Sequence, residues 1–111
     1  MKRVLIVHGD HLLSSGVEML LTLEKDFVVR STPESLLSSL KDEMAHFRPQ
    51  VVVIDQSCLE KDLSWFYHAM KSFPGIRFIV INLLKNIINV YSQSQVEVSR
   101  GSDLISTIRG S

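Results

Sequence analysis

The sequence predicts an α/β fold in which a doubly wound, mostly parallel sheet carries helices on both faces. Short, β-branched apolar runs typical of strands buried on both sides recur along the chain. They cover residues 3–7, 27–29, 50–54 and 77–81. Between them lie segments whose apolar residues repeat at helical spacing. Because strand and helix alternate, we expect parallel strands joined by right-handed crossovers.

Each expected helix has its own apolar stripe and end signals. The first covers residues 11–23. The second follows Thr32 and Pro33, a hydroxyl suited to the N-cap and a proline suited to the first turn. The third covers residues 65–73, and Ser102 is expected to cap a short last helix.

The segment after Asn82 allows two interpretations. Residues 87–91 and 96–98 both look extended, with a turn between them, which predicts a hairpin with an antiparallel strand at the sheet edge. A helix over residues 83–88 fits as well, although the segment is close to the lower limit for a crossover that contains a helix. The helix expected before the last strand is therefore either shortened or replaced by an extended segment.

Composition limits what the chain can do. The 111 residues fit one domain, residues 1–111, and twelve Lys and Arg balance twelve Asp and Glu. This neutrality does not favour a broad electrostatic contact with nucleic acid. The one cysteine cannot form an internal disulfide, and no Cys/His spacing suggests zinc. The longest apolar run is too short for a membrane span, so we expect a cytoplasmic protein without membrane contact.

Two segments resemble response-regulator receiver domains, most closely the branch with a LuxR-type helix-turn-helix output domain. Residues 4–17 read VLIVHGDHLLSSGV and are similar to the opening of that branch. Residues 49–55 read PQVVVID and are similar to the third strand, which ends in the phosphoacceptor aspartate. The resemblance implies a flavodoxin-like (CheY-like) sheet of five strands in the order 2-1-3-4-5, with its functional site at the carboxyl ends of strands one and three.

Measured against that pattern, the phosphorylation site has changed. Asp55 matches the phosphoacceptor, but the family's acidic pair falls on His8 and Gly9, which supply no carboxylate. Mg²⁺ needs oxygen ligands at this place. Asp10 comes one or two positions late, where it either caps the following helix or, with Asp55, holds a metal. An ion pair between His8 and Asp55 is also expected, since each charge would favour the other.

The two switch positions have changed as well. Asn82 stands where receivers carry Ser or Thr, and an amide does not copy a hydroxyl. The family's lysine has no clean match, with Ser99 or Arg100 nearest to it. Arg100 either supplies positive charge to the site or lies on the surface. A guanidinium does not freely replace an ammonium.

These changes predict a regulatory module, not an enzyme, that works through protein contacts without a normal Mg²⁺-dependent phosphorylation cycle. No cofactor is expected. Two alternatives remain open. One is a working receiver that binds Mg²⁺ and is phosphorylated on Asp55. The other is a flavodoxin-like sensor that binds a small molecule in the crevice at the carboxyl ends of strands one and three.

Partners are predicted from the apolar residues near the end of the chain. Ile87, Ile88, Val90 and Tyr91 either form a homodimer contact within residues 87–108 or are buried in the domain itself. The resemblance implies contact with DNA only through a C-terminal domain that is absent from this chain. Cys58 is expected in the loop after Asp55, as either a packing residue or a reactive thiol.

Overall fold

The centre of the molecule is a six-stranded sheet in the order β2-β1-β3-β4-β5-β6. A computed structural model describes residues 2–8, 11–33, 40–61, 63–82, 85–92, 95–100 and 103–110. The strands are β1 (Lys2–His8), β2 (Phe27–Pro33), β3 (Val51–Asp55), β4 (Arg77–Asn82), β5 (Ile87–Ser92) and β6 (Gln95–Arg100). The helices are α1 (His11–Thr22), α2 (Leu40–Phe47), α3 (Gln56–Lys61), α4 (Leu63–Ser72) and α5 (Leu104–Arg109).

The first four strands are parallel, which confirms the expected arrangement. β1 pairs with both β2 and β3, and β3 pairs with β4. The inner strands are apolar on both faces, and all of the first four residues of β3 are buried. A strand with this pattern needs helices above and below it. The order 2-1-3-4-5 is confirmed for the first five strands.

The expectation of five strands is wrong, because the chain adds a sixth. β4 pairs with β5 and β5 pairs with β6, both in antiparallel fashion, so an extended hairpin replaces a helix between the fourth strand and the last. The burial of alternate residues in β5 explains why this segment is a strand. Ile88 and Val90 are buried, while Ile87, the first residue of β5, is 38% exposed. A period of two residues fits a strand and not a helix.

Thr32 and Pro33 do not begin a helix as expected but complete strand β2. Thr32 is 2% exposed and pairs with Val7 in β1. The seven-residue β1 extends the ladder to this point, and pairing overrides the local capping signal. α2 is described from Leu40 onward, and the expected cap of the last helix, Ser102, lies outside the described residues.

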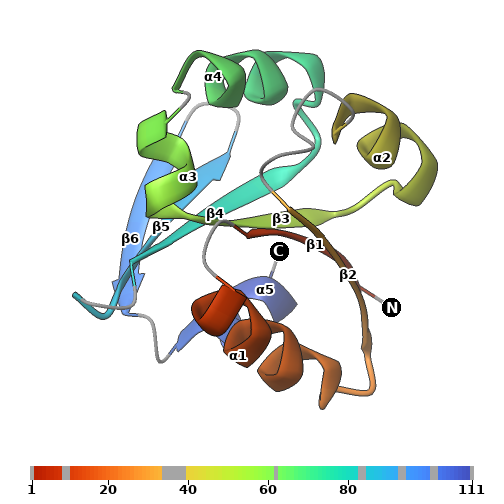
Figure 1. Ribbon diagram of the computed structural model, residues 1–111, viewed down its shortest axis with the longest axis vertical. Helices are drawn as coiled ribbons and strands as arrows, with labels where there is room; N and C mark the ends of the chain where they lie inside the picture. The colour runs from red at the N-terminus through yellow and green to blue at the C-terminus, as the bar shows by residue number, and fades with distance from the viewer. Residues whose placement is uncertain are drawn as a thin grey trace.

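Helices cover both faces of the sheet (Figure 1). α1 and α5 lie on one face, and α2, α3 and α4 lie on the other. Each face has its own core cluster; among the described residues, one has thirteen buried members that include Leu21 and Ile108, and the other has ten that include Met44 and Phe66. Among the described residues, no helix has the length and apolar character needed to span a bilayer.

Arg109 fastens the last helix to the beginning of β2. Its Nε and Nη2 atoms donate to the two carboxylate oxygens of Asp26 at 2.9 and 3.0 Å, and Nη2 also donates to Glu24 at 2.8 Å. The guanidinium lies 5.4 Å from the centre of the Phe27 ring. The hydrogen bond from Arg109 lowers the pKa of Asp26 below its ordinary value.

Candidate functional site

Three strand ends meet at one edge of the sheet, at the place where the sequence predicts function. His8 ends β1, Asp55 ends β3 and Asn82 ends β4. Val7 pairs with Ile54 in the β1–β3 ladder, so His8 and Asp55 follow on adjacent strands. The predicted convergence of the first and third strands is confirmed.

Asp55 joins β3 directly to a helix and not to a loop. Its Oδ1 atom accepts a hydrogen bond from the backbone N–H of Ser57 at 2.9 Å and another from the Ser57 hydroxyl at 3.0 Å. Since α3 begins at Gln56, these are the bonds of a helix N-cap, in which a side-chain oxygen satisfies an N–H of the first turn. The carboxylate therefore has a structural task in this chain.

Asn82 is held by its neighbours through both ends of its amide. Its Nδ2 donates to Gln56 Oε1 at 2.9 Å, and its Oδ1 accepts from the backbone N–H of Lys85 at 3.2 Å. The first bond connects the end of β4 to the first turn of α3, and the second orders the turn into β5. Two separate sets of hydrogen bonds, between Asp55 and Ser57 and between Asn82 and Gln56, thus lie on consecutive residues at the start of α3, and the four residues are called the edge network below.

The expected partners from the first strand lie largely outside the described residues. Gly9, Asp10 and the side chain of His8 all lie outside the part of the chain that the structure describes. The His8–Asp55 ion pair and a metal held by Asp10 therefore stay predictions. Within the described ranges, no group of three His, Cys, Asp or Glu side chains is placed to hold a metal ion.

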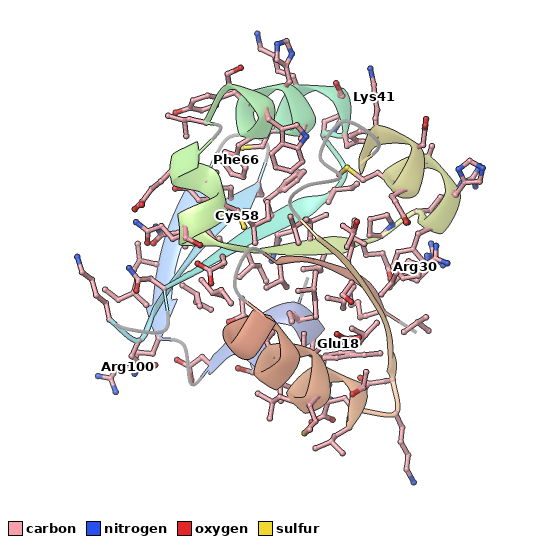
Figure 2. All side chains as sticks on the ribbon, in the orientation of Figure 1. Glu18, Arg30, Lys41, Cys58, Phe66 and Arg100 are labelled. Atoms are coloured by element: carbon pink, nitrogen blue, oxygen red, sulfur yellow. The ribbon has the colours of Figure 1, made fainter. Side chains whose placement is uncertain are left out.

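Arg100 ends β6 at the same edge, but it is separated from Asn82 by an intervening strand. Ile87 of β5 pairs with Asn82 on one side and with Arg100 on the other. At about 4.8 Å between neighbouring strands, the Arg100 backbone lies roughly 10 Å from that of Asn82. Its side chain is exposed and extends from the end of the sheet (Figure 2). Of the two interpretations of Arg100, the surface position fits this arrangement.

Two residues of the edge network, Gln56 and Ser57, lie in the segment where the sequence predicts function, but the sequence indicated no role for either of them. An aspartate followed two residues later by serine is a known local pattern in which the carboxylate accepts hydrogen bonds from the chain ahead of it. That signal could have indicated α3. The expected loop after Asp55 is instead helical, and Cys58 is 4% exposed and packs in the core cluster with Phe66.

The apolar residues of β5 divide between the core and the surface. Ile88 and Val90 are 0% and 3% exposed and belong to the core cluster beneath α1 and α5. Ile87 is 38% exposed and Tyr91 is half-buried. Burial in the domain itself is therefore confirmed for Ile88 and Val90, so these two residues are not available to a partner.

Comparison of the chain with models of protein families, with curated proteins and with solved structures finds no match.

Proposed function

We propose that this chain is a receiver-like regulatory module that works through protein contacts and does not run a Mg²⁺-dependent phosphorylation cycle. The proposal combines the resemblance of residues 4–17 and 49–55 to receiver domains with the edge network. One observation carries it: Oδ1 of Asp55 accepts two hydrogen bonds from Ser57 as the N-cap of α3.

Chemical reasoning supports this reading of Asp55. A phosphoacceptor carboxylate has to face a metal ion and a phosphodonor, and the charge on the transferred group has to be neutralised. Here the residues at the acidic-pair positions, His8 and Gly9, have no carboxylate. On the other side of the site, Asn82 is bonded to Gln56, and Arg100, which lies nearest in the sequence to the family's lysine position, is separated from Asn82 by strand β5.

Phosphorylation can be tested directly by intact-mass measurement. The protein is incubated with Mg²⁺ and acetyl phosphate, with Asp55→Asn as the matched control. We expect no gain of a phosphoryl group in either protein. A gain in the parent chain that disappears in Asp55→Asn would replace the proposal with the alternative of a working phosphoacceptor.

For the contact surface, we propose the open face and outer edge of the β5–β6 hairpin. β6 is the last strand of the sheet, and no strand among the described residues pairs with its outer side. Exposed strand edges of this kind are templates for pairing with another chain. Val98 on β6 is 69% exposed, and Ile87 lies two strand positions away on the neighbouring strand.

A homodimer through this surface makes a clear prediction for sedimentation. The parent chain is expected to show a concentration-dependent increase in mass, and Val98→Lys is expected to reduce it. Val28→Lys is the matched control, because Val28 is 38% exposed on β2 at the opposite edge of the sheet. A monomer at every concentration would exclude the homodimer, and equal effects of both variants would exclude the β6 edge.

A further inference from the structure

A hollow of about 530 Å³ opens at the edge of the sheet opposite to Asp55. It lies between the second half of α4, the start of β4 and the end of β5. Tyr67, Met70 and Lys71 come from α4, Phe78 from β4, and Tyr91 and Ser92 from β5. Its volume falls within the range of about 300–1,000 Å³ that small-molecule sites occupy.

The hollow exists because the helical layer ends before the sheet does. On this face the covering helices are α2, α3 and α4 (Figure 1). The chain then continues from β4 into the β5–β6 hairpin and places no helix over β5 before that hairpin. Tyr91 of β5 is consequently half-buried at the rim of the core cluster and not enclosed by it.

Phe78 and Tyr91 form the floor of the hollow, and Phe66 holds both rings from behind without lining the hollow itself. Phe66, which points from α4 toward the sheet (Figure 2), meets Phe78 at 5.7 Å and Tyr91 at 5.2 Å between ring centres. The interplanar angles are 85° and 81°, which is the edge-to-face geometry that aromatic pairs prefer. Phe66 and Phe78 are each 1% exposed. A floor held in this way is formed before a ligand arrives, which lowers the cost of binding.

The walls supply apolar contact and a single charge. Tyr67 is 60% exposed although it is a large aromatic residue, and the flexible thioether of Met70 lies beside it on α4. Among the described residues that line the hollow, only Lys71 carries a formal charge. Its ammonium forms no ion pair with any described residue. The charge that complements this wall is negative.

We infer that this hollow binds a small aromatic molecule carrying one carboxylate, with its ring against Tyr67, Phe78 and Tyr91 and its carboxylate at the ammonium of Lys71. Ring contacts with aromatic walls and one charge-assisted hydrogen bond are the interactions that the lining offers. The site is separate from the edge network and does not depend on the function proposed for Asp55.

Indole-3-acetate is a suitable probe, with its neutral amide indole-3-acetamide as the matched ligand. Each is titrated into the ¹⁵N-labelled chain and followed by two-dimensional NMR. We expect saturable shifts centred on Tyr67, Lys71 and Tyr91, with the acetate binding more tightly than the amide. Since exposed ion pairs contribute modestly, the preference should be about threefold. It should decrease as salt is added.

Lys71→Gln isolates the charge. It is expected to remove the preference for the acetate and leave the affinity for the amide unchanged, whereas Lys71→Arg keeps the preference. Lys41→Gln is the control, because Lys41 is an exposed lysine beside a separate hollow of about 260 Å³ between α2 and α4. Tyr67→Ala should weaken both ligands about fivefold by removing one aromatic wall.

The inference is overturned by shifts that do not saturate at millimolar probe or that centre elsewhere in the sheet. It is equally overturned if Lys71→Gln leaves the preference for the acetate intact, or if Lys41→Gln abolishes it to the same degree. Because Lys71 and Tyr67 are exposed, the variants are expected to keep the fold. Their NMR spectra without ligand check this expectation directly.

Discussion

Replacing Asp55 by alanine tests whether this carboxylate serves the fold. The substitution removes an acceptor that receives hydrogen bonds from the backbone N–H and the hydroxyl of Ser57. Loss of an N-cap aspartate to alanine costs about 0.5–2 kcal/mol. Since Ser57 is exposed and water can partly replace the lost acceptor, we expect a loss near the middle of that range, about 1 kcal/mol.

Urea unfolding followed by circular dichroism measures this loss. With a slope of about 1.5 kcal/mol per molar urea, the midpoint of Asp55→Ala should fall by roughly 0.7 M. Asp55→Asn keeps an oxygen at the Oδ1 position and should lose less than half as much. Ser57→Ala removes the hydroxyl bond but keeps the backbone bond, so its midpoint should lie between those of the parent and of Asp55→Ala.

The sign of the effect decides between two roles for Asp55. A carboxylate in a metal-binding acidic cluster is repelled by its neighbours, so removing it raises the free energy of unfolding in the absence of metal. A capping carboxylate has the opposite effect when it is removed. If Asp55→Ala were as stable as the parent or more so, the structural role assigned to Asp55 would be wrong.

Three further predictions concern the rest of the fold. Phe66→Ala should lower the free energy of unfolding by about 3–5 kcal/mol, because a buried ring that packs against three others is lost. Tyr67→Ala on the exposed side of the same helix should change it by no more than about 0.5 kcal/mol, and equal losses would contradict the packing. Arg109→Gln should destabilise the chain at neutral pH, and the difference from the parent should shrink on acidification, measured by urea unfolding at each pH. The pKa of Asp26 is lowered in the folded state, so its contribution is present above the ordinary value of 3.8 and is lost as the pH falls below that. The buried thiol of Cys58 should react with a disulfide reagent only as fast as the protein opens, and labelling at the rate of a free peptide would disprove its burial.

The parallel part of the sheet could be predicted because each strand carries its own signal. The runs that became β1, β3 and β4 are continuously apolar, and only a strand between two helical layers buries such a run completely. The convergence of His8 and Asp55 followed from the parallel order of the strands, without any knowledge of the side chains. The identity and order of the parallel strands were therefore predicted most reliably from the sequence.

The hairpin and α3 were harder to predict because their signals are not local. The segment after Asn82 suits a helix as well as a strand, and the choice depends on Ile88 and Val90 finding space under α1 and α5. α3 has six residues, too few to show a helical period, and its start depends on a bond from Ser57 back to Asp55. The prediction that Thr32 caps a helix was wrong for a related reason. Thr32 pairs with Val7 of β1, so the length of β1 decides its conformation.

The contacts of Asp26 bring the two ends of the chain together. The backbone N–H of Lys2 donates to the Asp26 carbonyl at 2.8 Å, while the guanidinium of Arg109 donates to the carboxylate of the same residue. A chain whose beginning and end share one anchoring residue can be rewired by circular permutation. A short glycine–serine linker from residue 110 to residue 2, with new ends at the exposed turn of Pro74 and Gly75, would keep every strand pairing and both core clusters. In the permuted chain, β4, β5, β6 and α5 would be synthesised before β1.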